Sequence, residues 1–206
     1  MAGIILSIQP ATTSAAPGSS GDSFDVILTN TGPSGVSIAG FNFELTAADP
    51  DVTLTQVTFG TAAPYIFSGI SLFGPVLNSN GPGATIDASD LTSNFSDVTI
   101  ASNSTVGLGH VFFSVAPNAT LVPGAVSFSG GIAGNSLTNA AGQNVPIDTL
   151  TAGSIDVVVP EPATFLLVLP VLAFLAMTRG EGFVGFTEFW IAFARAQDRF
   201  ARWTRL

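Results

Sequence analysis

The sequence predicts an all-β fold, a two-sheet antiparallel β-sandwich, followed by a C-terminal transmembrane helix and a short amphipathic helix. Three observations predict this organisation. Apolar and polar residues alternate through much of residues 1–159, as they do in half-buried antiparallel strands. Gly- and Pro-containing turns separate these runs. All basic residues lie in residues 179–206, after an uncharged apolar segment.

The alternating runs give the expected strands in chain order. They occupy residues 4–8, 24–29, 41–45, 52–59, 111–115, 126–128 and 155–159. The alternation changes phase within 52–59, which predicts a β-bulge near Thr55–Gln56. Residues 60–105 are less regular and are expected to form one or two strands with long loops. Two facing sheets bury the apolar faces, so the predicted core contains Phe24, Val26, Leu28, Phe41, Phe43, Val111 and Phe113.

Charge and composition exclude several classes of function. Residues 1–178 contain eleven acidic residues and no basic one, so the main domain repels phosphate and a nucleic-acid partner is excluded. Cysteine is absent, which excludes a disulfide scaffold, a thiol nucleophile and a thiolate metal site. His110 is the one histidine, so a multi-histidine metal site is excluded as well. We expect no cofactor and no metal.

The segment after residue 159 has the composition of a membrane span. Proline cannot donate to a β-ladder, so Pro160 and Pro162 end the last strand. Residues 162–178 carry no charge, and as a helix they would extend roughly 25 Å, near the lower limit for crossing a bilayer core of about 30 Å. A buried core helix is the alternative. Arg179 and the later basic residues predict, by the positive-inside rule, a cytoplasmic C-terminus and an extracytoplasmic sandwich.

Residues 180–206 predict a cytoplasmic, basic amphipathic helix that lies on membrane lipid. On a helical wheel one side carries the aromatic residues Phe186, Phe189, Trp190, Phe193, Phe200 and Trp203. The other side carries the charged residues Glu188, Arg195, Asp198, Arg199, Arg202 and Arg205. This division is typical of interfacial helices. A solvated tail and a shifted reading frame are the alternatives.

The segment Val159–Thr164, the apolar stretch after it and the closing Arg179 resemble the PEP-CTERM sorting signal. The resemblance assigns the signal to Pro160, Glu161, Pro162 and Arg179. It implies recognition by an exosortase, a membrane-embedded cysteine protease. It also implies that the protein stays transiently in the inner membrane and is then delivered to the cell surface or extracellular matrix of a Gram-negative bacterium. There it would be associated with exopolysaccharide or biofilm. Members of this family begin with a secretory signal peptide, so we expect a start upstream of Met1 or a trimmed chain.

Two groups of segments in the main domain resemble cohesins. The alternating run Ile4–Ile8, the turn-containing segment Pro17–Val26 and the run Val36–Leu45 are similar to the first strands of that family. Gly109–Val115 followed by Pro123-Gly124 is similar to its later phenylalanine-rich strand and turn. The resemblance implies a nine-stranded jelly-roll sandwich related to carbohydrate-binding modules, and it transfers no dockerin-binding residue to this chain.

Candidate site residues each have a structural alternative. Asp49 and Asp51, and likewise Asp87 and Asp90, carry oxygen ligands suited to Ca²⁺, although a turn between strands also explains them. A glycosidase-type acid pair would come from Asp22, Asp25, Glu44, Asp87, Asp90 and Asp97, and the sequence favours no pair. His110 is expected on a strand face rather than as a catalytic base. An aromatic sugar-binding platform or core packing would account for Tyr65, Phe67 and Phe73.

Three functions follow, in order of preference. The first is a non-enzymatic surface or extracellular-matrix protein that an exosortase sorts through residues 160–179. The second is a cohesin-like module that binds carbohydrate or protein through the sandwich. The third is an acid-pair hydrolase. The expected partners are the exosortase and membrane lipid, with a polysaccharide as a further candidate.

Overall fold

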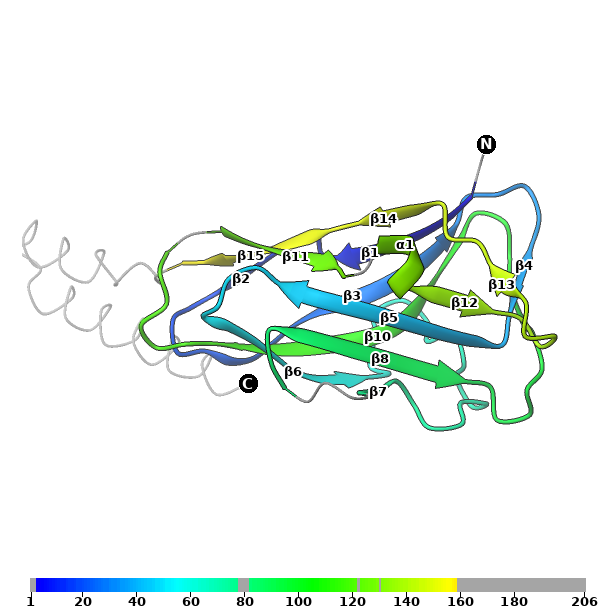
Figure 1. Ribbon diagram of the computed structural model, residues 1–206, viewed down its shortest axis with the longest axis horizontal. Coiled ribbons are helices and arrows are strands. Elements are labelled where there is room, and N and C mark those ends of the chain that lie inside the picture. The colour runs from blue at the N-terminus through cyan, green and yellow to red at the C-terminus, as the bar shows by residue number, and fades with distance from the viewer. Residues whose placement is uncertain (1–2, 78–81, 122, 130, 159–206) are drawn as a thin grey trace, which may run out of the picture. The chain divides into compact units, whose positions relative to one another are not determined.

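A computed structural model describes residues 3–77, 82–121, 123–129 and 131–158. Strands make up all the regular structure of this part except one four-residue helix, α1 (Figure 1). The elements are β1 (Ile4–Gln9), β2 (Thr12–Ala15), β3 (Ser20–Asn30), β4 (Val36–Ile38), β5 (Gly40–Ala47), β6 (Val52–Thr58), β7 (Val76–Leu77), β8 (Thr85–Leu91), β9 (Val98–Ile100), β10 (Ser104–Val115), β11 (Pro123–Phe128), α1 (Gly131–Gly134), β12 (Ser136–Thr138), β13 (Asn144–Val145), β14 (Thr149–Thr151) and β15 (Gly153–Val157).

Two main sheets form the predicted sandwich. The first has five strands in the order β14-β1-β3-β10-β6. The second contains β13-β12-β5-β11-β15-β2, with β8 on the other side of β5 and β7 beyond β8. A short pair, β4 and β9, forms a third sheet. The sandwich expected from the alternation is therefore confirmed for the described residues.

The inward faces of both sheets form one apolar core. All seven core residues predicted from the sequence are buried, none of them more than 4% exposed: Phe24, Val26, Leu28, Phe41, Phe43, Val111 and Phe113. Phe43 of the larger sheet packs against Gly109 of the opposite sheet, where an added Cβ would come within 3.0 Å of the Phe43 ring. Glycine at this position therefore lets the two sheets approach each other.

The β-bulge predicted near Thr55–Gln56 is present in β6. Its pairing with β10 steps from Phe112 opposite Gln56 to Phe113 opposite Leu54, which leaves Thr55 as the extra residue. The change of phase in the sequence thus has a direct structural cause, because one unpaired residue reverses the faces of those that follow.

Two strand pairs are parallel, so the expectation of a purely antiparallel sandwich is wrong for these pairs. β1 pairs with β14 and β2 pairs with β15, both in parallel. The chain crosses from one sheet to the other between β1 and β2, around a cis Gln9–Pro10 peptide bond, and again between β14 and β15. Alternation predicts which face of a strand is buried, but it carries no information on the direction of the neighbouring strand.

A side chain completes the ladder where β11 gives way to β12 along β5. Between these strands the chain leaves the sheet and forms α1, so on this side of β5 the main chain of Glu44 has no strand partner. Asn135, 2% exposed, fills the gap: its Oδ1 accepts from the Glu44 N–H at 2.9 Å, while its Nδ2 donates to the carbonyls of Ser129 and Gly131. The Ser129 N–H donates to the Glu44 carbonyl at 2.9 Å.

Asn135→Ala should lower the free energy of unfolding by about 2 kcal/mol, because it leaves part-buried main-chain groups without this partner. Asn135→Asp keeps the acceptor and should lose less. Asn118→Ala, at an exposed turn position, is the control and should change stability by no more than about 0.5 kcal/mol. Urea unfolding followed by circular dichroism measures the three differences. Equal stability of the Asn135→Ala and Asn118→Ala proteins would contradict the role given to Asn135.

The described residues include no helix that is both long and apolar enough to span a bilayer. The expected membrane helix in 160–179, the sorting residues Pro160, Glu161, Pro162 and Arg179, and the tail 180–206 all lie outside the described part of the chain. These remain predictions from the sequence.

Candidate functional site

Two loops carry most of the exposed apolar side chains of the sandwich. The first, residues 59–76, runs from the end of β6 to the first residue of β7, and the second, residues 91–96, begins with the last residue of β8. Main-chain hydrogen bonds join them: the Leu72 N–H donates to the Leu91 carbonyl at 2.8 Å, and the Ser93 N–H donates to the Ile70 carbonyl at 2.7 Å. In Figure 1 the second loop leaves the end of the β8 arrow.

We call the exposed apolar residues of these loops the aromatic surface. Seven large apolar side chains are exposed in the described residues, and five of them belong to it: Phe59, Phe73, Val76, Leu91 and Phe95. Its three phenylalanine side chains are between 63% and 69% exposed. Phe95 also has a φ of 53°, in the left-handed region that bulky residues disfavour. Such concentrated exposure is uncommon on a domain without a binding partner.

A depression of about 360 Å³ lies within the aromatic surface. It is lined by Phe59, Tyr65, Phe67, Ser68, Gly69, Ser71, Phe73 and Gly74. The Phe59 and Tyr65 ring centroids are 6.3 Å apart, and Phe59 also lies beside Gly74. The walls are therefore mainly aromatic.

The buried carboxylate of Asp90 holds the loop in this shape. Asp90 is 1% exposed and ends the inward-facing row of β8. Its Oδ2 accepts from the Tyr65 hydroxyl at 2.5 Å and from Ser71 Oγ at 2.6 Å. Its Oδ1 accepts from the Leu91 N–H at 2.8 Å and from the Phe73 N–H at 3.3 Å. One side chain thus binds both loops.

Asp25 anchors the beginning of the first loop in the same way. Its Oδ2 accepts from the Ala62 N–H at 2.7 Å, and its Oδ1 lies 2.6 Å from Nδ1 of His110. Asp25 and His110 occupy paired positions in β3 and β10, which brings their side chains to the same face. His110 is therefore a strand-face residue, as expected, and it orients an anchoring carboxylate.

Core packing fixes the middle of the first loop. Phe67 is fully buried and stacks on Phe41, with 5.6 Å between ring centroids. Gly69 and Gly74 both have a φ of 76°, which glycine adopts without steric cost. Anchors at 25, 67 and 90 hold the loop before any partner arrives, so binding requires little further ordering.

The hydroxyl of Tyr65 is protected from ionisation. Burial raises its pKa well above the usual value of about 10, and the hydrogen bond to Asp90 and the charge of that carboxylate raise it further. Tyr65 therefore remains a hydrogen-bond donor to Asp90 at neutral and moderately alkaline pH.

Alkaline titration tests this arrangement cleanly, because the chain has one tyrosine, no lysine and no cysteine. The raised folded-state pKa contributes stability that is complete below the unfolded pKa of about 10 and is lost as pH rises beyond it. Ultraviolet absorbance of tyrosinate should therefore appear together with unfolding, well above pH 10. Tyr65→Phe should abolish that part of the alkaline loss of stability, and Asp90→Asn should move the absorbance change to lower pH. Tyrosinate formation near pH 10 in the folded wild-type chain would contradict the geometry.

The aromatic candidates from the sequence have different fates. All three line the depression, but Phe73 is exposed, Tyr65 is half-buried and Phe67 belongs to the core. Phe59 joins them, although its place at the end of an alternating run predicted a strand residue. No periodic pattern distinguishes it from a core position.

Of the calcium candidates, Asp49 and Asp51 lie in the turn between β5 and β6, whereas Asp87 and Asp90 lie in β8. Asp49 Oδ1 accepts from the Asp51 N–H at 2.9 Å, and Asp51 Oδ2 accepts from the Thr120 N–H at 3.3 Å. The first contact lies within the turn between β5 and β6, and the second joins this turn to the loop between β10 and β11. The described residues include no group of three or more His, Cys, Asp or Glu side chains placed to hold a metal ion.

Most of the candidate acid-pair residues have structural roles. Asp25 and Asp90 are anchors, Asp22 accepts from Ser19 Oγ at 2.5 Å, and Asp97 accepts from the Ala140 N–H at 2.6 Å. Glu44 and Asp87 lie directly opposite each other in the β5–β8 ladder, at positions facing away from the core. Neither lines the aromatic depression, so the structure does not join this pair to a binding cleft.

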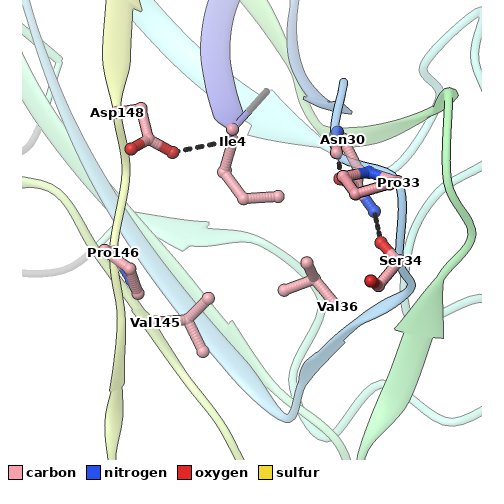
Figure 2. A pocket seen from close by; sticks show the side chains of 10 residues that line it. Ile4, Asn30, Pro33, Ser34, Val36, Val145, Pro146 and Asp148 are labelled. Carbon is pink, nitrogen blue, oxygen red and sulfur yellow. Dashed lines mark hydrogen bonds between the residues drawn. The ribbon is translucent and has the colours of Figure 1, made fainter. Parts of the chain in front are cut away.

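A second depression, of about 300 Å³, lies near the start of β1 (Figure 2). Ile4, Val36 and Val145 face it in the close-up. Its polar groups are used in joining segments: Asp148 Oδ2 accepts from the Ile4 N–H at 2.8 Å, and Asn30 Nδ2 donates to the Ser34 carbonyl at 2.8 Å. We therefore regard this depression as part of the packing between neighbouring segments and not as a ligand site.

Comparison with known proteins supports the fold. No protein-family model matches the sequence, and no curated protein matches it at a significant level. The structure is similar to the sixth cohesin of scaffoldin B from Acetivibrio cellulolyticus, solved in complex with a dockerin (18% identity, TM-score 0.56, covering 76% of this chain and 99% of that one). It is also similar to a type I cohesin from Pseudobacteroides cellulosolvens (15%, 0.56, 78% and 95%) and to a non-cellulosomal cohesin from the archaeon Archaeoglobus fulgidus (16%, 0.51, 80% and 96%).

The described sandwich thus has a cohesin-like fold, as the resemblance in the sequence implied. At this level of identity the likeness concerns the fold alone. The PEP-CTERM resemblance continues to rest on residues 159–179 themselves.

Proposed function

We propose that the sandwich is a non-enzymatic protein-binding module whose partner docks on the aromatic surface. The observation that carries the proposal is the exposure of Phe59 and Phe73 on a loop held rigidly by Asp25 and Asp90. Exposed apolar area costs solubility, and a preformed loop lowers the entropy lost on binding. Both features are those of a surface shaped for a partner.

The solved neighbours support this choice. The scaffoldin cohesin from Acetivibrio cellulolyticus is a protein-binding domain in its complex with a dockerin. The cohesin from Archaeoglobus fulgidus is a non-cellulosomal one, so the cohesin fold also occurs outside cellulosomes. A protein ligand other than a dockerin is consistent with both.

A polysaccharide is the other ligand that the aromatic rings favour. Sugar recognition needs convergent polar groups beside the apolar face. Here Tyr65 and Ser71 direct their hydroxyls to Asp90, and Asp90 accepts four hydrogen bonds from the protein itself. Those groups already have partners, which favours a protein ligand over a glycan.

Site-specific crosslinking in the native host tests the module. A photoreactive phenylalanine analogue at position 73 should form a protein adduct, and Phe59→Ala should abolish that adduct. The same analogue at Leu121, an exposed apolar position outside the aromatic surface, is the matched control and should give none. Equal protein adducts at both positions, or a polysaccharide adduct at position 73, would contradict the proposal.

We further propose that the protein reaches the cell surface or extracellular matrix through residues 160–179, after recognition by an exosortase in the inner membrane. The arrangement of Pro160-Glu161-Pro162, an uncharged apolar segment and Arg179 supports this. The tail 180–206 would then rest on the cytoplasmic lipid surface until processing. A protein-binding domain delivered in this way would act in an exopolysaccharide or biofilm matrix without catalysing a reaction.

Processing has a mass signature. In a host with an active exosortase, mass spectrometry of surface material should show a mature chain that ends near Glu161 and lacks the apolar segment. Glu161→Ala should retain the uncleaved form in the membrane, whereas Asp156→Ala, in β15, should leave processing unchanged. Recovery of only the full-length wild-type protein from membranes of that host would refute the sorting role.

A further inference from the structure

We infer that the aromatic surface receives one bulky apolar side chain of the partner, flanked in the partner's sequence by Lys or Arg. This inference rests on the proposed protein-binding function and specifies the chemistry of the partner. It combines three properties of the described residues: the shape of the depression, the state of its polar groups and the charge of the domain around it.

The shape fits a single anchor. The depression of about 360 Å³ is at the small end of the range for ligand sites, about 300–1,000 Å³. The side chains of Phe59, Tyr65 and Phe73 line it, together with the buried Phe67. Aromatic walls interact best with an aromatic or branched apolar side chain through stacked or edge-to-face contact.

The polar groups of the depression leave little for a polar anchor. The hydroxyl of Tyr65 donates to Asp90, and Ser71 Oγ donates to Asp90 while accepting from the Gly74 N–H at 2.6 Å. Both carboxylate oxygens of Asp90 accept two hydrogen bonds each. Inserting a polar group would break these contacts or leave the group itself without a partner, and either outcome costs free energy.

The charge of the domain determines which residues of the partner are favoured beside its apolar anchor. The described residues contain ten carboxylate side chains, one histidine and neither lysine nor arginine. One carboxylate, Asp97, is exposed in the segment that follows the second loop, two residues after Phe95. The field therefore attracts cationic partners and repels anionic ones.

The exposed rings add a second attraction for cations. The side chains of Phe59, Phe73 and Phe95 are largely exposed to solvent. Lys and Arg bind the faces of aromatic rings through cation–π contact. Basic residues beside the apolar anchor would therefore gain from both the ring faces and the acidic surroundings.

A pair of probes with the same ring and opposite charges tests the inference. Phenethylammonium carries an aromatic ring with a cation, and phenylacetate carries the same ring with an anion. The chain has no cysteine, so Ser96→Cys accepts a single trifluoromethyl tag beside Phe95. Fluorine NMR of the full chain in zwitterionic lipid nanodiscs then reports binding at the aromatic surface, and a tag at Asn118→Cys reports binding elsewhere.

At low salt, phenethylammonium should shift the tag at position 96 and bind about fivefold more tightly than phenylacetate, and high salt should remove most of this preference. The tag at position 118 should not move. The double substitution Phe59→Ala and Phe73→Ala should abolish the shift, whereas Leu121→Ala should leave it unchanged. Because both phenylalanines are exposed, the double variant should fold, and an unchanged circular dichroism spectrum would verify this.

The contrary outcomes separate the two proposals. Equal binding of the two probes at low salt, or no shift with either, overturns this inference and leaves the crosslinking experiment to decide on protein binding. A shift caused by cellohexaose or by fragments of the host's exopolysaccharide, lost in the double variant, overturns the inference and the protein-binding function together.

Discussion

The carboxylate of Asp90 is the contact on which the aromatic surface depends. It is buried at the end of β8, where an unpaired charge would be very costly, and four donors from two loops compensate it. Tyr65 and Ser71 provide the side-chain donors, and Leu91 and Phe73 provide main-chain N–H groups. Without this carboxylate, main-chain hydrogen bonds would still join the two loops, but the groups that donate to Asp90 would lose their common acceptor.

The composition of the chain explains why neutral groups donate the hydrogen bonds that stabilise the buried carboxylate of Asp90. Residues 1–178 contain no lysine or arginine, so the sandwich has no permanently charged cation to pair with a carboxylate. Amide side chains take over at other loops. Asn30, 1% exposed, accepts from the Gly32 N–H and donates to the carbonyls of Ser34, Ile100 and Ala101, and Asn135 completes the ladder beside β5. An amide both donates and accepts, so one side chain can replace several missing main-chain contacts.

Alternation predicted seven of the strands, among them β1, β3 and β10, and the core, because one buried face leaves a period of two in the sequence. The same rule explains what was missed. In β8 the inward row is Ile86, Ala88 and Asp90, so its last member resembles any surface acid until the fold buries it. Phe59, Phe67 and Phe73 are alike in composition, yet only Phe67 enters the core, because loop residues follow individual anchors rather than a period. The direction of a neighbouring strand leaves no local pattern, which is why the two parallel pairs were not foreseen.

The acidic field also makes an exposed aromatic surface tolerable. Five apolar side chains at the ends of two loops would ordinarily promote self-association. With ten carboxylates and no lysine or arginine in the described residues, two copies of the domain repel each other at the distances from which such contact begins. A basic partner meets attraction where a second copy meets repulsion. The same negative charge therefore disfavours self-association at the aromatic surface and favours a cationic ligand. Repulsion between copies of the domain thus contributes to specificity together with the shape of the depression.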